Sequence, residues 1–112
     1  MREVEKAWGR ELIIVNCDKY CGKLLCLNKG AESSYHQHGK KQETFFCLEG
    51  QVALNIENRD YILKPYSRPK TIKPETLHKF RGITSALIIE FSMPHDDKDV
   101  YRVTESKARV SE

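Results

Sequence analysis

Residues 30–50 read GAESSYHQHGKKQETFFCLEG and place two histidines and a glutamate between two glycines. Residues two apart on a β-strand point to the same face, so His36 and His38 are expected to project together. The polar turn 39–42 lets a second strand return alongside, with Glu43 at its start. We therefore predict that these three side chains face one interior and share a metal ion.

A third imidazole comes from residues 74–80, PETLHKF, a predicted turn leading into a short strand that carries His78. Three imidazoles and a carboxylate favour one divalent transition metal (Zn, Mn, Fe, Ni or Co) over Ca²⁺ or Mg²⁺. Four protein ligands leave positions open on a six-coordinate ion, which indicates ligand binding or catalysis. The alternative is that the His-x-His pair lies on an ordinary polar surface strand.

The rest of the chain has the pattern of an all-β protein. Short apolar segments alternate with turn residues roughly every 8–12 residues, the spacing of a sandwich or barrel. The expected strands cover residues 12–15, 24–27, 44–48, 52–56, 61–63 and 86–91. A helical turn is allowed around residues 4–8. We expect a single domain over 1–112, with a barrel core of about 10–104 and a polar C-terminal tail.

Composition excludes several classes of protein. The 112 residues carry a formal net charge of +3, and basic and acidic residues alternate. Nucleic-acid binders instead gather basic residues in a patch, so no nucleic-acid partner is expected. No apolar run reaches the about 20 residues of a membrane helix, and no signal peptide is recognised, so a cytoplasmic protein is expected. The four cysteines lack a paired zinc motif and are expected to be reduced thiols.

The spacing of the glycines, histidines and glutamate in residues 30–50 resembles the first motif of the cupin family, Gly-x5-His-x-His-x4-Glu-x6-Gly. The matching residues are Gly30, His36, His38, Glu43 and Gly50. His78 matches the histidine of the second cupin motif, whereas Lys73, Glu75 and Gly82 replace its usual proline, glycine and asparagine. The resemblance implies a single-domain cupin, a double-stranded β-helix or jelly-roll barrel. It also implies metal ligation by His36, His38, Glu43 and His78.

Flanking segments narrow the resemblance to sugar-modifying cupins. Ala7-Trp8-Gly9 resembles the opening of the cupin domain in type II phosphomannose isomerases. Residues 88–92, IIEFS, and 95–102, HDDKDVYR, look like the end of small sugar-isomerase cupins and of cupin modules in sialic-acid-synthase-like enzymes. The implied function is isomerisation or epimerisation of a sugar or sugar phosphate. A non-catalytic sugar- or metabolite-binding module and an iron-dependent dioxygenase are the alternatives.

An isomerase of this kind needs a base to move a proton between two carbons. Glu43 is a candidate as either ligand or base. Glu90 is the second catalytic candidate, because a carboxylate inside an apolar strand needs a partner. A strand-end acid facing water is the alternative for Glu90.

Three further residues are substrate-binding candidates through the resemblance. Lys23 and Arg102 could bind a phosphate or carboxylate, and His95 could lie in the pocket or behind it. Ordinary surface positions are the alternatives for all three. Strand parity also predicts that Phe45, Cys47 and Phe80 point inward with the metal ligands.

A homodimer is expected because a short barrel buries little surface alone. Trp8, Tyr101 and Val103 are the interface candidates. Packing of these side chains on their own barrel is the alternative.

Overall fold

The computed structural model describes residues 1–108, which contain eleven β-strands and no helix. No segment within that range is therefore a helix long and apolar enough to cross a membrane. The strands are β1 (Arg2–Lys6), β2 (Gly9–Asn16), β3 (Cys21–Leu27), β4 (His36–Gln37), β5 (Glu43–Glu49), β6 (Val52–Ile56), β7 (Arg59–Leu63), β8 (Lys70–Ile72), β9 (His78–Gly82), β10 (Ala86–Ser92) and β11 (Tyr101–Arg102).

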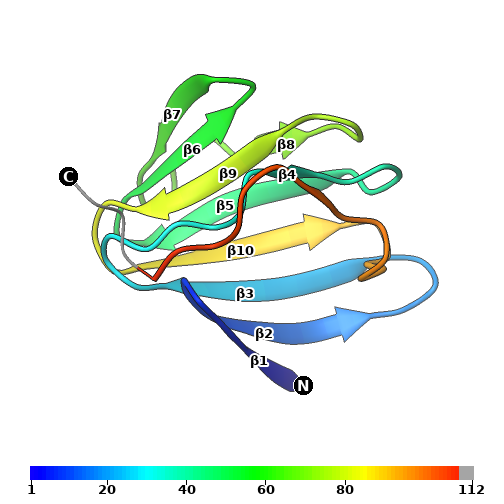
Figure 1. Cartoon of the computed structure of the whole chain (residues 1–112). Coiled ribbons are helices and arrows are strands. Elements are labelled where there is room, and N and C mark those ends of the chain that lie inside the picture. The colour runs from blue at the N-terminus through cyan, green and yellow to red at the C-terminus, as the bar shows by residue number, and fades with distance from the viewer. Residues whose placement is uncertain (109–112) are drawn as a thin grey trace.

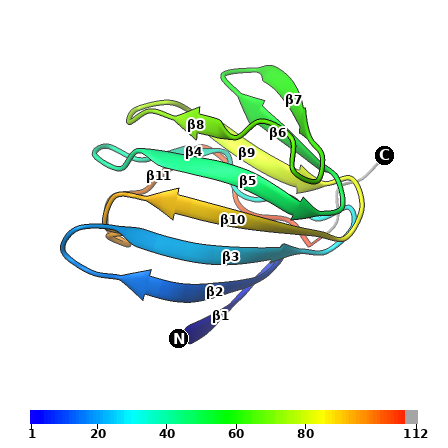
Figure 2. The same ribbon diagram turned by 180° about the vertical axis from the view of Figure 1, so that it is seen from behind.

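The strands form two antiparallel sheets that face each other (Figures 1 and 2). One sheet has six strands in the order β1-β2-β3-β10-β5-β8, and the other has five in the order β11-β4-β9-β6-β7. Neighbours in each sheet are often distant in sequence, as where β10 lies between β3 and β5. This architecture confirms the predicted all-β double-stranded β-helix.

Alternation of side chains explains why these segments are strands. In β5, Glu43, Phe45 and Cys47 are buried, and the residues between them are partly exposed. In β9, His78 and Phe80 are buried in the same manner. The inward directions predicted for these side chains are confirmed. One face of each strand therefore carries both core residues and polar site residues.

The apolar core lies between the sheets and forms part of the wall of a polar pocket. Its members include Trp8, Leu25, Phe45, Leu54, Ile72, Phe80 and Ile88. Trp8 packs edge-to-face on Phe80 with ring centroids 5.1 Å apart and is 5% exposed. The expectation that Trp8 lies in a dimer interface is therefore wrong, because its ring is buried in its own barrel. Tyr101 and Val103 are exposed, and the homodimer stays a prediction.

Strand pairing includes residues closer to both ends of the described chain than expected. Residues 4–6 lie in strand β1 and pair with β2, so the helical turn allowed around residues 4–8 does not form. Near the other end, Glu32 and Lys107 exchange backbone hydrogen bonds of 2.8 Å. Strand pairing thus extends outside the expected core limits of 10 and 104. The last residues of the predicted tail, 109–112, lie outside the described residues.

The turn between β5 and β6 requires Gly50, the second glycine of the first cupin motif. Gly50 has a φ of +75°, and a Cβ there would lie 2.1 Å from the carbonyl oxygen of Ser85. Other residues would be strained in this conformation and would clash with backbone. The second glycine of the motif therefore serves the fold and not the chemistry.

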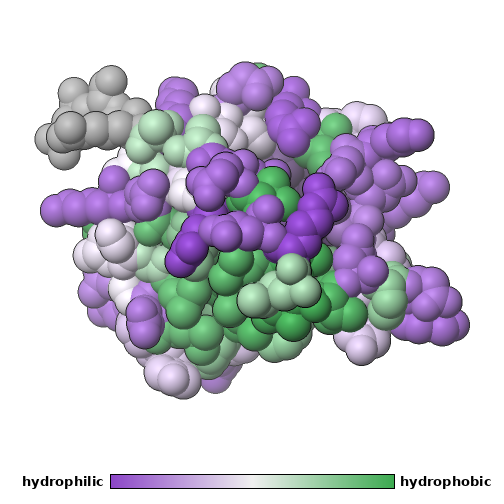
Figure 3. Space-filling model, turned by 90° about the horizontal axis from the view of Figure 1, so that it is seen from below, coloured by the Kyte–Doolittle hydropathy of each residue, from purple (hydrophilic) through white to green (hydrophobic). Residues whose placement is uncertain are grey.

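The outer face of the six-stranded sheet is largely apolar. Seen from the side of β1 and β2, hydrophobic side chains form a continuous area (Figure 3). Ile14 and Phe91 are about half exposed, at 47% and 54%. Leu12, Leu24 and Ile89, which alternate with inward residues, are partly exposed. This face is more apolar than the mixed, charged surface predicted from composition.

Replacing Leu54 by alanine tests the core. Leu54 is fully buried on β6, so Leu54→Ala should lower the free energy of unfolding by about 2–5 kcal/mol. Ile62→Ala on neighbouring β7, where the side chain is 49% exposed, should change it by about 0.5 kcal/mol or less. Urea unfolding followed by the fluorescence of the single tryptophan measures both. Equal losses for the two variants would contradict the assigned core.

Candidate metal centre

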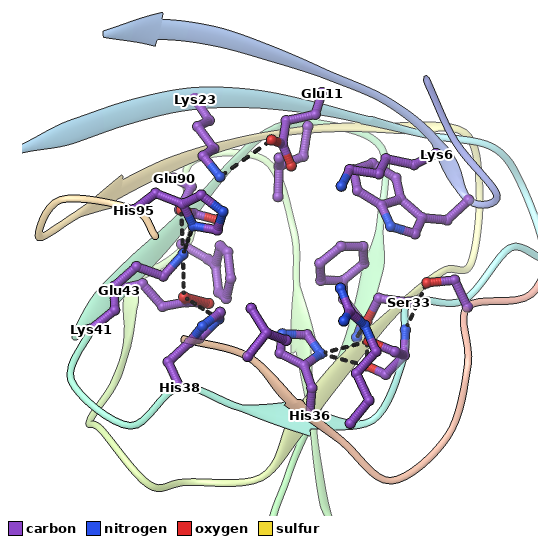
Figure 4. A pocket seen from close by; sticks show the side chains of 18 of the residues that line it. Lys6, Glu11, Lys23, Ser33, His36, His38, Lys41, Glu43, Glu90 and His95 are labelled. Atoms are coloured by element: carbon purple, nitrogen blue, oxygen red, sulfur yellow. Dashed lines mark hydrogen bonds and ion pairs between the residues drawn. The ribbon is translucent and has the colours of Figure 1, made fainter. Parts of the chain in front are cut away.

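Three imidazoles converge beside the pocket. His36 lies on β4, His38 directly follows it, and His78 begins β9, paired across from His36. One ring nitrogen from each lies within 4.8 Å of the others. His36 and His38 point into the pocket in Figure 4. The pairing of β4 with β9 therefore brings together His36 and His78, which are 42 residues apart in sequence.

The hydrogen bonds of the three rings fix which nitrogen carries the proton. Each Nδ1 contacts a backbone carbonyl oxygen: that of Ser34 for His36 (2.8 Å), of Asp99 for His38 (2.9 Å) and of Thr76 for His78 (2.8 Å). Because a carbonyl oxygen only accepts, Nδ1 must donate. In its neutral form each ring therefore carries its free lone pair on Nε2, the arrangement typical of metal-ligating histidines.

Glu43 places a carboxylate against two of these lone pairs. Its Oε1 lies 3.0 Å from Nε2 of His78, and its Oε2 lies 3.2 Å from Nε2 of His38. Glu43 Oε2 is buried and has no partner with hydrogen-bond geometry among the described residues. Lone pairs that face each other at such distances repel unless a proton or a cation lies near them. The donor set of three imidazoles and a carboxylate thus fits a divalent transition metal.

The protonation states also suit a metal. Burial, followed by the neighbouring His78, lowers the pKa of His36 to about 3, which keeps its imidazole neutral. Burial alone would raise the pKa of Glu43, but its close contacts with His38 and His78 and the charge of Lys41 bring it well below its usual range. Neutral imidazole and ionised carboxylate are the forms that bind metals.

A second buried carboxylate, Glu90, lies beside this cluster. The Nζ atom of Lys41 is 3.3 Å from Glu43 Oε2, 3.5 Å from Glu90 Oε2 and 3.0 Å from Nδ1 of His95. Burial and then the charge of Glu43 raise the pKa of Glu90. Burial would lower the pKa of Lys41, but the two glutamates raise it above its ordinary value. Lys41 is therefore an ammonium that links the two carboxylates.

Lys41 was missed at the sequence level because it lies in the segment interpreted as a polar turn. The signal was its spacing, since it precedes Glu43 by two residues and so shares its direction. It is buried, whereas Lys40 beside it is exposed.

The segment after β10 holds the three-histidine cluster in place. The carboxylate of Asp99 accepts hydrogen bonds from the backbone N–H groups of Gly39, Lys40 and Lys41, at 2.9–3.3 Å. Its carbonyl oxygen accepts from His38, as described above. Asp99 therefore fixes both the β4–β5 turn and the orientation of one imidazole.

The structure brings the predicted substrate-binding residues to the same pocket. Lys23, His95 and Arg102 all line it, together with His36, His38, Glu43 and Glu90. Lys23 lies within β3 and is 2% exposed, so it is not a surface lysine. The ring of His95 is held between Lys41 and Asp97, and Arg102 is exposed at the rim. Glu11 and Lys6 also line the pocket and were not predicted.

The fold and the site together define this chain as a cupin with a candidate metal centre. Solved structures of low sequence identity share the fold. KdgF from Halomonas sp. has a TM-score of 0.73 and 18% identity, over 80% of this chain and 81% of that one. CapF, a capsular polysaccharide assembling protein from Staphylococcus aureus, has a TM-score of 0.81 and 16% identity, over 92% and 34%. PAC13 from Streptomyces, solved with uridine, has a TM-score of 0.79 and 10% identity, over 93% and 84%.

No family model matches the chain, but curated relatives do. A D-lyxose/D-mannose isomerase from Thermosediminibacter oceani is 36% identical, covering 86% of this chain and 68% of the relative. A D-lyxose ketol-isomerase from Thermofilum sp. is 31% identical, covering 84% and 68%. The chain belongs to the D-lyxose isomerase family of cupins. The predicted resemblance to sugar-isomerase cupins is confirmed.

Loss of the Asp99 carboxylate should weaken metal binding without removing a ligand. Asp99→Ala releases the β4–β5 turn, so we expect an affinity for Zn²⁺ about 10–100-fold lower, as for other partners that orient ligands. Asp18→Ala, an exposed aspartate between β2 and β3, is the matched control and should keep wild-type affinity. Competition with a chelating dye measures both. Unchanged affinity in Asp99→Ala would show that the turn needs no such support.

Proposed function

We propose that this protein is a metal-dependent aldose–ketose isomerase that acts on an aldose of the D-lyxose or D-mannose type. Three imidazoles with free Nε2 lone pairs and the carboxylate of Glu43 converge beside a second buried carboxylate, Glu90. That arrangement is the observation that carries the proposal. The isomerase names of both curated relatives support it over the binding module and the dioxygenase.

His36, His38, Glu43 and His78 would hold one divalent transition metal, with Zn, Mn, Fe, Ni and Co as the candidates. When bound, such an ion supplies a Lewis acid that polarises the sugar carbonyl. Glu43 is assigned as a ligand and not as the base, because its two oxygens face two imidazole Nε2 atoms. Its negative charge is then part of the metal site.

Glu90 is the proposed base. It would take the proton from C2 of the aldose and return it to C1, while the hydroxyl proton of C2 moves to the former carbonyl oxygen on C1. The product is the ketose with the same atoms. A raised pKa suits a carboxylate that must both accept and return a proton. The Lys41 ammonium, in contact with Glu43 and Glu90, would hold the base beside the reacting carbons.

Lys23, His95 and Arg102 would contact the rest of the sugar, since all three line the same pocket. His95 is held by Lys41 and Asp97, so its place depends on the same charge network as Glu90. Burial followed by the charges of Lys23 and Lys41 lowers the pKa of His95, which favours a neutral ring. A neutral ring can accept a hydrogen bond from Lys41 at Nδ1 and donate one to Asp97 from Nε2, which holds it at the wall of the pocket.

Metal content and turnover test the proposal directly. Elemental mass spectrometry of the purified protein should find about one divalent transition metal per chain, as for a single catalytic site. His36→Ala should lose both the metal and the formation of ketose from D-lyxose or D-mannose. Gln37→Ala, the neighbouring residue on β4, should keep both. A wild-type protein that stays metal-free after each of the five ions has been offered would overturn the proposed mechanism.

Glu90→Gln separates chemistry from metal binding. We expect kcat to fall by about 10²–10⁴-fold while the metal stays bound, because the variant loses the base but no ligand. Glu49→Gln, an exposed glutamate at the end of β5, is the matched control. Exchange of the C2 proton with deuterated solvent measures the proton transfer itself. Full turnover in Glu90→Gln would remove Glu90 from the mechanism.

A further inference from the structure

A buried ion pair lines the pocket away from the metal ligands. Lys23 on β3 and Glu11 on β2 lie diagonally on neighbouring strands, since Lys23 pairs with Ile13. The Nζ atom of Lys23 is 3.2 Å from Glu11 Oε1, and the two side chains are 3% and 12% exposed. Figure 4 shows the pair on one side of the pocket and His36 and His38 on the opposite side.

The pair keeps unused hydrogen-bonding capacity toward the cavity. An ammonium has three donors and a carboxylate about four acceptor sites. Within residues 1–108, the structure gives Lys23 and Glu11 polar side-chain partners only in each other. Burying two charges costs desolvation energy that a single contact does not repay well. A donor and an acceptor side by side match two neighbouring sugar hydroxyls, each of which can donate and accept.

The charges of the pocket disfavour an anionic substrate. The positive charge of Lys23 is balanced by Glu11, and that of Lys41 by Glu43 and Glu90. A phosphate placed near Lys23 would also meet the carboxylate of Glu11 in a poorly solvated site, where repulsion is strong. Lys6 and Arg102 also line the pocket, but both are exposed, and solvent weakens their attraction. Such a repulsive element is one way to reject a competing ligand.

We infer that Glu11 and Lys23 bind the hydroxyls at the end of the sugar away from C1 and C2, and that Glu11 makes the site select neutral sugars over sugar phosphates. The inference rests on the proposed function for the identity of the reacting end. It replaces the expectation that Lys23 binds a phosphate or carboxylate.

Glu11→Gln tests both parts of the inference. The variant keeps the shape of the side chain but weakens its hold on the hydroxyls, so KM for D-mannose should rise about tenfold, the loss of one good hydrogen bond. We expect kcat to change less than about threefold and the metal content to stay unchanged. Among residues 1–108, Glu11 forms its ion pair with Lys23 and not with the metal ligands or Glu90, and its charge acts on Glu90 less than Glu43, Lys41 and Lys23 do. Glu3→Gln, which removes the exposed carboxylate paired with Arg10, is the matched control and should behave as wild type.

Binding measured without turnover separates this inference from the proposed function. Calorimetry with D-mannitol and D-mannitol 1-phosphate, which have no carbonyl to isomerise, reports the subsite alone. Wild type should bind the polyol and reject its phosphate. Glu11→Gln should lose about tenfold in affinity for the polyol and gain affinity for the phosphate, since the charge of Lys23 is then uncovered. These binding results stand even if no ketose is formed from any sugar.

A double variant controls for the case in which Glu11→Gln alone does not fold. Glu11→Gln leaves a buried lysine without its counter-charge, whereas Glu11→Gln/Lys23→Gln removes both charges and should fold. The double variant should bind the polyol more weakly than wild type and should not gain phosphate binding. Wild-type affinity for the polyol in both variants, or a wild-type protein that binds the phosphate as well as the polyol, would overturn the inference.

Discussion

The carboxylate of Glu43 lies against two imidazole nitrogens in a dry interior, and the rest of the site depends on this contact. Its oxygens are 3.0 and 3.2 Å from the Nε2 atoms of His78 and His38. Backbone carbonyls hold both Nδ1 protons on the far side of the rings. Hydrogen-bond acceptors therefore lie close together in a buried site. A cation stabilises this arrangement, whereas burial of the acceptors without a partner costs free energy. The pairing of β4 with β9 and the Asp99 contacts keep them there.

The same need to balance charge shapes the remainder of the pocket. Lys41 links Glu43 to Glu90, and Glu11 pairs with Lys23 on the neighbouring strands. Each buried charge therefore has an opposite charge within reach, which limits the cost of burying it. The arrangement places Glu90, a carboxylate of raised pKa, beside the candidate metal centre. The ion pair of Glu11 and Lys23, which has no net charge, lies further away. One network thus serves both proton transfer and choice of substrate in the proposed function.

Fold and function rest on different observations in this protein. Structures with 10–18% identity share the two-sheet barrel and differ in what they are named for. A fold of this kind carries many activities, so the barrel alone assigns none. Family membership comes from relatives above 30% identity, both named as isomerases. The chemistry is argued from Glu43, Glu90 and the three imidazoles.

The sequence by itself predicted most of the longer strands and the candidate metal ligands. Alternation and turn residues predict the barrel, and the spacing of His36, His38 and Glu43 brings them to one face, because both are local properties of a strand. The core position of Trp8, the burial of Lys41 and the pairing of Glu11 with Lys23 were decided only by the tertiary structure. Each depends on which strands become neighbours, as where β2 lies beside β3 and β10 between β3 and β5. Those pairings join residues far apart in the chain, and no local pattern records them.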